Sequence, residues 1–410
     1  MLLRLYSARV ILLLLTALRT AAGYSVLSHE AIIDAAWDQS IRPILAARFP
    51  DATPDDLRKA HGYAYGGAII QDMGYYPFGS HLFSDLVHYI RSGDFILSLL
   101  TQAQDLNEYA FALGALAHYA SDNEGHSLAV NRAVPMLYPK VRAKFGAVAT
   151  YEDDPADHLK TEFAFDVSEL AEHHYAPEAY HEFIGFGVAK PLLERAFQAT
   201  YGIPLTDVSK TLDLALGTYR RTVSSIIPEM TRVAWDEKKK ELRKDTPGLS
   251  RRRFVYAISR SSYEKEWGNS YEKPGFWARF LAFLLRIAPK VGPFRALSFR
   301  PATPEAQKLF MDSFVRSLAV YRKKLEEVGR GSPPVLANDN FDIAKVAQFG
   351  TYWLADEACG QLVTRLGEKK FAGIDAPLRD GILKFYGSSS PEDPKVIAAL
   401  KELRAWAVPQ

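Results

Sequence analysis

The stretch Gly114-Ala-Leu-Ala-His-Tyr-Ala-Ser-Asp-Asn-Glu-Gly-His126 spaces two histidines and an aspartate, His118, Asp122 and His126, four residues apart. Its apolar periodicity predicts a helix. On a helix, residues four apart lie on neighbouring turns of one face, so the three side chains share a stripe. Imidazole nitrogens and carboxylate oxygens on one stripe can bind a transition metal. The stretch therefore predicts a helical fold that carries a metal site.

Further candidate ligands lie on both sides of this helix. His158 and Glu162 repeat the four-residue spacing, and Asp72 and His88 precede the helix. A lone histidine on a helix is usually a surface or core residue, but these pairs together favour a multinuclear site. Mixed imidazole and carboxylate ligands with positions open for water suit zinc and hydrolytic chemistry. The candidate ligands are His29, Asp72, His88, His118, Asp122, His126, His158 and Glu162, with His61 and His81 also available.

The rest of the chain also favours helices. Its 410 residues, 48% of them hydrophobic, can bury a sizeable core. No run of alternating apolar and polar residues bounded by turns predicts a sheet. We therefore expect an all-α fold, a multi-helix bundle with a further, mostly helical C-terminal region. Helices are predicted at 30–47, after Thr53, and at 83–92, 94–103, 105–121, 155–172, 207–243, 303–328, 341–366 and 394–406, with Ser28 and Asp393 as N-caps of the first and last.

Two segments depart from the pattern of amphipathic helices. Residues 63–74 are rich in glycine and tyrosine, which indicates a close-packed or loop-like stretch. Residues 332–339 begin with Ser332-Pro-Pro334, which indicates a linker.

The first 23 residues have the pattern of a secretory signal peptide. Arg4 and Arg9 are positive, residues 10–18 form a short apolar run, and small residues follow at 21–23. The run is too short to span a bilayer by itself, although an uncleaved anchor or a buried helix is the alternative. We expect cleavage after Gly23 (or after Ala22) and export to the periplasm or the extracellular space.

The net charge and the number of cysteines limit the kinds of protein that this sequence can encode. The net charge of about +2 gives no global field that favours nucleic acid. The single cysteine, Cys359, excludes an internal disulfide framework. It lies in an apolar helical pattern, which predicts a buried structural thiol rather than a nucleophile. No Walker-type loop and no Rossmann fingerprint is found in the sequence.

The composition shifts near residue 245. Asp245-Thr-Pro-Gly248 breaks the preceding helix, and a basic, aromatic stretch follows from Arg251. Within 275–295, the segment from Phe276 to Arg286 is apolar on most faces, with arginines on one side. It has the pattern of a helix that contacts a membrane surface, or of a buried core helix whose arginines reach the solvent.

The pattern His118-x3-Asp122-x3-His126, followed by His158-x3-Glu162, resembles the ligand core of the zinc-dependent phospholipase C family. Single-strand-specific zinc nucleases share the all-α fold of that family. The resemblance covers roughly Tyr24 to Lys240. It implies a catalytic domain at 24–244 that follows the signal peptide at 1–23 and precedes a helical C-terminal extension at 245–410.

The resemblance also implies roles for single residues around three zinc ions. Tyr24, as the mature N-terminus, would chelate one zinc through its amine and carbonyl, together with His29. Asp122 would bridge this zinc to a second one, which Asp72, His88 and His118 would also hold. Asp72 would be the general base for the attacking water. The ligands of the third zinc would be His126, His158 and Glu162.

Clustered zinc ions suit the cleavage of phosphate esters. The first hypothesis is a phospholipase C-like enzyme that acts on phospholipid headgroups, and no obligate protein partner is evident. The second is a single-strand-specific nuclease, which needs aromatic stacking platforms. Residues near Asp72 could supply such platforms, namely Tyr63, Tyr65, Tyr75, Tyr76 and Phe78. The third hypothesis is a non-catalytic exported protein stabilised by zinc.

Overall fold

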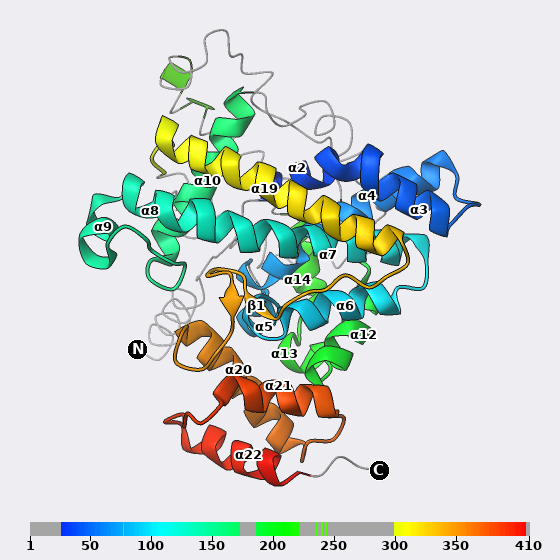
Figure 1. The fold of residues 1–410 in the computed structure, drawn as a ribbon, viewed down its shortest axis with the longest axis vertical. Coiled ribbons are helices and arrows are strands. Elements are labelled where there is room, and N and C mark those ends of the chain that lie inside the picture. Colours follow the sequence, from blue (N-terminus) through cyan, green and yellow to red (C-terminus); the bar gives the residue numbers. More distant parts are fainter. Residues whose placement is uncertain are drawn as a thin grey trace, which may run out of the picture.

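The computed structural model describes residues 26–76, 78–172, 186–221, 235–236, 239–240, 243 and 299–406. Within these ranges helices dominate, and the strands there are limited to two residues each in one antiparallel pair. The all-α prediction is thus confirmed (Figure 1). Several predicted features lie outside the described residues, namely the signal peptide, Tyr24, the run from Arg251, the segment 275–295 and most of 222–243.

The helices of the first part of the chain surround one central helix, α7 (Leu106–Gly125). In chain order they are α2 (Val26–Ala36), the π-helical turn η1 (Trp37–Ile41), α3 (Arg42–Arg48), α4 (Pro54–Ile69), the 3-10 turn η2 (Ile70–Tyr75), α5 (His81–Tyr89), α6 (Ser92–Gln102), α7, the π-helical turn η3 (His126–Val130), α8 (Asn131–Leu137), α9 (Pro139–Phe145), α10 (Pro155–Glu172), α12 (Lys190–Tyr201), α13 (Leu205–Val208) and α14 (Leu212–Arg221).

The central helix is defined by its N-cap and by its small residues. The Asp105 carboxylate accepts a hydrogen bond from the Glu108 amide (2.8 Å), which satisfies one free amide of the first turn. Along the helix, alanine and glycine let neighbouring backbones come close. A Cβ at Gly114 would lie 2.0 Å from the Ala64 carbonyl oxygen of α4, so no side chain fits there. This close crossing brings the end of α4 against the ligand face of α7.

Residues 63–74 are helical and close-packed, so the first of the two predicted alternatives is confirmed and the loop-like one is wrong. They form the second half of α4 and most of η2. The glycines that suggested a loop serve helix packing instead, because a Cβ at Gly67 would lie 1.9 Å from the Phe111 carbonyl oxygen of α7. The start of α4 was predicted correctly. Thr53 and Asp56 form a capping box, with Thr53 Oγ1 accepting from the Asp56 amide (3.2 Å).

Two further details of the N-terminal half differ from the prediction. Ser28 lies inside α2 instead of capping it, and its hydroxyl donates to Asp166 Oδ1 at 2.8 Å. The continuous helix predicted from residue 207 is interrupted, because Ser209 adopts a non-helical backbone (φ −131°, ψ 81°) between α13 and α14. The prediction for 155–172 matches α10.

The long helix α19 (Pro304–Gly329) lies along α7, and this placement joins the C-terminal part of the chain to the N-terminal part (Figure 1). Tyr321, fully buried on α19, donates its hydroxyl hydrogen to the Leu113 carbonyl of α7 (2.8 Å). Described residues that precede and follow the segment 244–298 therefore share one hydrophobic core. The predicted boundaries of α19 and the irregular backbone at 332–338 are confirmed.

The helix predicted at 341–366 begins only at residue 353. The strands β1 (Asp339–Asn340) and β2 (Lys345–Val346) form a short hairpin, and α20 (Trp353–Glu368) follows it. Ala344 in the hairpin and Gly350 after it have positive φ values of 51° and 83°, which interrupt a right-handed helix. The apolar periodicity of α20 was predicted correctly, but it does not extend upstream of Trp353.

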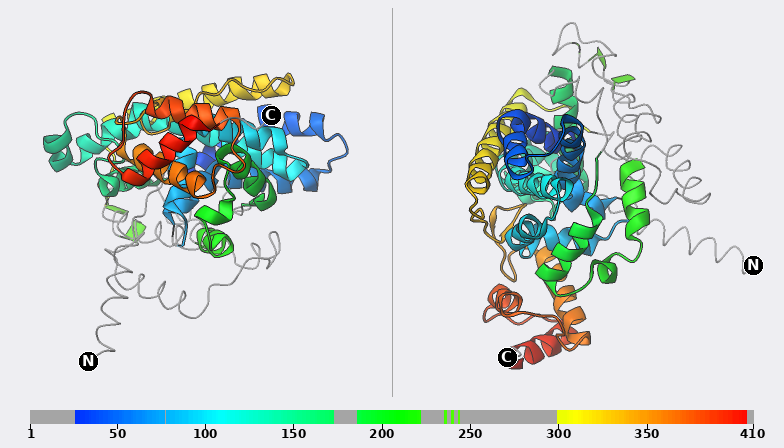
Figure 2. Two further views of the ribbon diagram at one scale, coloured as in Figure 1. Left: turned by 90° about the horizontal axis from the view of Figure 1, so that it is seen from below. Right: turned by 90° about the vertical axis from the view of Figure 1, so that its right-hand side faces the viewer.

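The last helices, α20, α21 (Ala376–Tyr386) and α22 (Pro394–Ala405), gather at the end of the molecule opposite to α2 and α4 (Figures 1 and 2). Asp393 caps α22 as predicted, by accepting from the Lys395 amide (2.8 Å). Cys359 is fully buried in α20, as predicted, and burial raises the pKa of its thiol.

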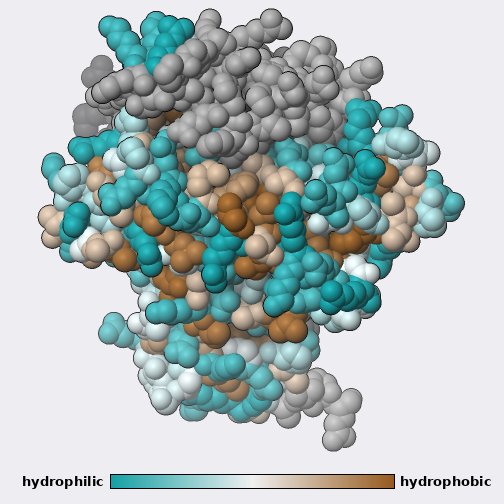
Figure 3. All heavy atoms as spheres, turned by 45° about the horizontal axis from the view of Figure 1, so that its top comes forward, coloured by the Kyte–Doolittle hydropathy of each residue, from teal (hydrophilic) through white to brown (hydrophobic). Residues whose placement is uncertain are grey.

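None of the helices in the described ranges is long and apolar enough to cross a membrane. On the face drawn in Figure 3, hydrophobic residues lie among hydrophilic ones over the described elements.

Candidate metal centre

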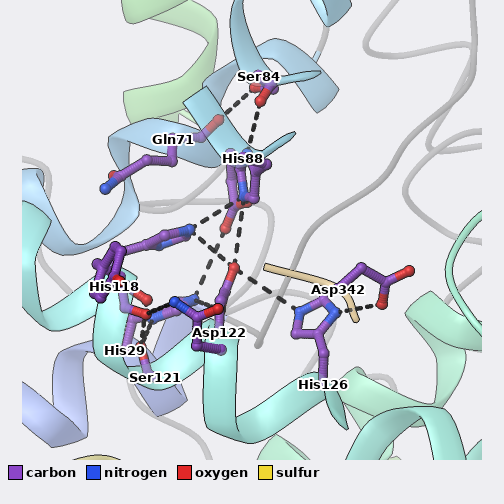
Figure 4. Close-up of polar contacts among 12 residues, drawn as sticks. His29, Gln71, Ser84, His88, His118, Ser121, Asp122, His126 and Asp342 are labelled. Carbon is purple, nitrogen blue, oxygen red and sulfur yellow. Dashed lines mark hydrogen bonds and ion pairs between the residues drawn. The ribbon is translucent and has the colours of Figure 1, made fainter. Parts of the chain in front are cut away.

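Eight of the nine ligands predicted from the sequence converge in the interior of the bundle (Figure 4). They are carried by α2 (His29), η2 (Asp72), α5 (His88), α7 (His118 and Asp122), η3 (His126) and α10 (His158 and Glu162), and all are buried. The ninth, Tyr24, lies outside the described residues. Its distance from His29 along the chain is five residues.

A first group of four ligands surrounds one point. His88 Nε2 lies 3.3 Å from Asp72 Oδ1 and 3.5 Å from Asp122 Oδ2, while His118 Nε2 lies 3.0 Å from Asp122 Oδ2. The two imidazole Nε2 atoms are 3.1 Å apart. Four ligands at about 2.0–2.1 Å from a tetrahedral zinc are separated by about 3.3 Å. The observed distances therefore fit a single zinc ion held by these four side chains.

Each imidazole of this group is oriented by a hydrogen bond from its Nδ1 atom, on the side of the ring that faces away from the other ligands. His118 Nδ1 donates to the Ala68 carbonyl oxygen (2.9 Å), and His88 Nδ1 donates to the Ser84 carbonyl oxygen (2.8 Å). These bonds favour the tautomer whose Nε2 lone pair is free to coordinate a metal. The Ser84 hydroxyl in turn donates to the Gln71 carbonyl, which ties α5 to η2 beside Asp72.

His29 approaches the same group from α2. Its Nε2 lies 3.4 Å from Asp122 Oδ1 and 4.0 Å from Asp72 Oδ2. Both carboxylates thus direct one oxygen toward His88 and the other toward His29. The Ser121 hydroxyl, which itself donates to the Ala117 carbonyl, accepts from His29 Nδ1 (3.0 Å). Asp122 is therefore placed to bridge two adjacent metal positions.

A second group consists of His126, His158 and Glu162. The rings of His126 and His158 lie 5.1 Å apart, and His158 Nε2 is 2.9 Å from Glu162 Oε1 without hydrogen-bond geometry. Within the described part of the chain, His126 Nε2, His158 Nε2 and both Glu162 oxygens are buried and lack a hydrogen-bond partner. Buried polar atoms without partners are costly, and a metal ion is the partner that suits this donor set.

The turn that follows α7 sets the position of His126. The helix passes at His126 into the wider π-helical turn η3, which places the His126 Nε2 atom 3.8 Å from Asp122 Oδ2. Single π-turns within α-helices are frequent at functional sites. The π-helical turn thus brings His126 of the second ligand group close to Asp122 of the first.

One residue of the site was not predicted from the sequence. Asp342, in the hairpin between β1 and β2, accepts a hydrogen bond from His126 Nδ1 at 2.9 Å (Figure 4). His126 and Asp342 are 216 residues apart, and no local pattern marks this contact in the sequence. Asp342 is also near enough to His126 and His158 to form a geometric triad with them. Its oxygens, however, already accept bonds from other donors.

The remaining histidine candidates lie elsewhere. His61 Nε2 is 3.1 Å from Asp34 Oδ1, and its ring stacks on Trp37. His81 begins α5, with its ring 6.0 Å from that of Tyr75. His88, and not His81, therefore lies beside Asp72 and Asp122.

The shifted pKa values of the buried histidines and of Glu162 suit a site that binds cations. Burial lowers the pKa of His29 and of His158 to about 3, so both imidazoles are neutral and can coordinate at neutral pH. Burial also lowers the pKa of His88, but Asp122 and Asp72 outweigh it and raise the value to about 10 in the absence of metal. Burial and the nearby carboxylates raise the pKa of Glu162 well above its ordinary value. Metal binding would thus displace protons from His88 and Glu162.

No curated protein and no solved structure matched the chain. A comparison with protein families gave a match over residues 28–210, a range that begins just before His29 and contains all eight converging ligands. The family is described as zinc dependent phospholipase C. Residues 28–210 therefore match the model of the zinc-dependent phospholipase C family, and the converging ligands lie within the matched range.

Proposed function

We propose that the protein is an exported, zinc-dependent phosphoric ester hydrolase that cleaves the phosphodiester of a phospholipid headgroup. The observation that carries the proposal is the arrangement of Asp122, whose two oxygens face His29 on one side and His88 with His118 on the other. A single structural ion needs only a closed set of four ligands, whereas a bridging carboxylate between adjacent positions is typical of multinuclear hydrolytic centres.

The centre we propose holds three zinc ions. Asp72, His88, His118 and Asp122 would hold the first, for which their mutual distances are suited. His29 and Asp122 would hold the second, with the amine and carbonyl of Tyr24 as the mature N-terminus. The third would be held by His126, His158 and Glu162. The pairs of unpartnered atoms at Glu162 and His158 support the third position.

Bound zinc would supply Lewis acidity, which polarises phosphoryl oxygens and lowers the pKa of a coordinated water to about 7. The chain provides the base and the orientation. Asp72 Oδ1 lies 3.3 Å from His88 Nε2, and Asp72 Oδ2 lies 4.0 Å from His29 Nε2. Burial raises the pKa of Asp72, but the hydrogen bond from His88 and the charge of His118 lower it below its ordinary value. Asp72 thus lies beside the first zinc position with its second oxygen toward His29, where a general base for the attacking water would be placed.

A phospholipid is favoured over single-stranded nucleic acid because of the aromatic residues near Asp72. Stacking with bases requires exposed rings. Tyr65 and Tyr75 are buried, Tyr63 and Tyr76 are only partly accessible, and Phe78 alone among the five is exposed (43%). Four of these five rings therefore pack into the protein rather than present a stacking surface.

The test compares two substrates on the zinc-loaded, full-length protein. We expect hydrolysis of a phosphatidylcholine analogue, with release of the phosphorylated headgroup, and no cleavage of single-stranded DNA. His118→Ala should remove turnover and reduce the zinc content, whereas His81→Gln, at a histidine outside the ligand groups, should leave both unchanged. DNA cleavage without lipid hydrolysis would favour the nuclease. Full zinc content without turnover on either substrate would favour a structural role.

Export is tested separately. Sequencing of the N-terminus of the mature protein should give Tyr24 as the first residue, since only a free amine there can chelate zinc together with His29. A mature chain that starts at Met1 would contradict both export by cleavage and the second zinc position.

A further inference from the structure

The segment from Ala337 to Asp342, here called the crossing segment, lies outside the family match but runs over the helices that carry the ligands. Tyr119 of α7 exchanges two hydrogen bonds with the backbone of Ala337, both at 3.1 Å. The Ser92 hydroxyl at the start of α6 donates to the Asp339 carbonyl oxygen (2.6 Å). These bonds fix the crossing segment to α7, which carries His118, and to α6, which follows the helix of His88.

Phe341 of the crossing segment packs directly on two ligands. Its amide donates to the carbonyl oxygen of His88 (3.1 Å). Its fully buried ring meets the His88 imidazole edge to face at 5.5 Å and lies 6.0 Å from the His118 imidazole. The ring therefore excludes solvent from this side of the first ligand group.

The Asp342 carboxylate accepts three hydrogen bonds. Oδ1 accepts from His126 Nδ1 (2.9 Å), and Oδ2 accepts from the Tyr151 amide (2.8 Å) and the Tyr352 hydroxyl (2.7 Å). Its own carbonyl oxygen accepts from the Asn131 side chain (2.7 Å). A buried carboxylate with its acceptors already used is a poor candidate for a metal ligand. Glu162, whose two oxygens lack hydrogen bonds in the described part of the chain, is the better one.

We propose that Asp342 is a positioning residue for the metal centre, which holds the His126 imidazole in the tautomer and orientation needed to coordinate a zinc ion. The proposal rests on the proposed function, because it requires His126 to be a ligand. Acceptance of the Nδ1 hydrogen leaves the Nε2 lone pair directed toward Asp122 and the second ligand group. Figure 4 shows the His126 ring between Asp122 and Asp342. A ligand is thereby oriented by a residue beyond the family domain.

The site distinguishes a carboxylate from an amide at position 342. An asparagine that keeps its oxygen on His126 Nδ1 must turn its NH2 group toward the Tyr151 amide, which is also a donor. The opposite orientation places the NH2 group on His126 Nδ1. The hydrogen of the imidazole would then have to move to Nε2, the atom that coordinates zinc. Asp342→Asn therefore either repels the Tyr151 amide, which displaces the side chain that orients His126, or removes the Nε2 lone pair of His126.

The experiment measures zinc affinity of the full-length protein in competition with a chromophoric chelator. Loss of such an orienting partner typically reduces metal affinity by about 10- to 100-fold. In Asp342→Asn we expect this loss of affinity only at the zinc site that contains His126, and unchanged affinity at the other zinc sites. Asp339→Asn is the matched control, because it removes the same charge from the same hairpin. Among the described residues, none of the metal ligands forms a hydrogen bond with the Asp339 carboxylate. Cobalt-substituted Asp342→Asn should also show an altered visible spectrum, which a purely structural role would not produce in a folded variant.

Nitrogen NMR of the wild-type protein with labelled histidine gives a readout that does not depend on the folding of a variant. We expect His126 to carry its hydrogen on Nδ1. A hydrogen on Nε2, or an Asp342→Asn variant with wild-type zinc affinity and cobalt spectrum, would overturn the proposal. Absence of zinc binding by the wild-type protein would instead contradict the proposed function, so the two failures are distinguishable.

Discussion

Removal of zinc should destabilise the whole fold, not only abolish turnover. The reason lies in the second ligand group, where four buried atoms have no hydrogen-bond partner in the described part of the chain: His126 Nε2, His158 Nε2, Glu162 Oε1 and Glu162 Oε2. Each such atom costs about 1–3 kcal/mol when it is left unsatisfied, so the four together cost about 4–12 kcal/mol. The total free energy of unfolding of a natural domain is about 5–15 kcal/mol.

This magnitude translates into a large change in melting temperature. A loss of 1 kcal/mol lowers the melting temperature of one cooperative unit of 410 residues by about 1–2 °C. The lower limit of about 4 kcal/mol therefore corresponds to a decrease of roughly 4–8 °C. The assay is thermal unfolding followed by circular dichroism, on protein as isolated, after exhaustive chelation, and after zinc is added back. The metal content of each sample is measured in parallel.

Two comparisons decide the interpretation. Zinc should restore the original melting temperature, whereas magnesium, which prefers oxygen ligands in octahedral geometry, should not. If metal-free protein melted within about 2 °C of the zinc-loaded protein, a cost of this size at the second ligand group would be refuted.

Three further outcomes are expected. Asp72→Asn should retain zinc but lower kcat by about 10²- to 10⁴-fold, as measured by steady-state hydrolysis beside metal analysis, and full activity would exclude Asp72 as the base. Gly114→Ala should destabilise the fold by about 1–3 kcal/mol or more in urea unfolding, because its Cβ would lie 2.0 Å from the Ala64 carbonyl oxygen. Gly381→Ala, with no atom nearer than 3.7 Å, should instead be neutral or stabilising by up to about 1 kcal/mol. Burial raises the pKa of the half-buried Glu152 from 4.5 to about 7, so the folded state binds more protons between these values and loses stability as the pH rises through that window. The melting temperature of Glu152→Gln should fall less than that of the wild type between pH 4.5 and 7, and parallel pH profiles would contradict this origin.

The part of the site that could be predicted from the sequence is the part built on local geometry. His118 with Asp122, and His158 with Glu162, are four residues apart, and helix geometry alone places the members of each pair together. Asp342 could not be found in this way. Its contact with His126 spans 216 residues and depends on how α19 returns the chain across α7.

The errors in the predicted fold have a similar origin. Glycine is a poor helix former, so residues 63–74 resembled a loop. The tertiary structure overrides this propensity, because Gly67 and Gly114 let α4 and α7 approach closely. Upstream of α20, apolar residues such as Phe341 suggested a longer helix. Phe341 is buried against His88 and His118 instead, through a hairpin that leaves the helical path.

The hydrogen bond between His126 and Asp342 has a consequence for the order in which the protein matures. Contacts between residues distant in sequence close large loops, and the entropy of loop closure makes them form late. The first ligand group uses residues no further along the chain than Asp122, so a nascent chain could gather it early. The imidazole of His126 is fixed only once the hairpin at 339–346 has been synthesised and docked. Acquisition of the third metal ion would therefore be coupled to completion of the chain, and a truncated product would be left without a fully assembled centre.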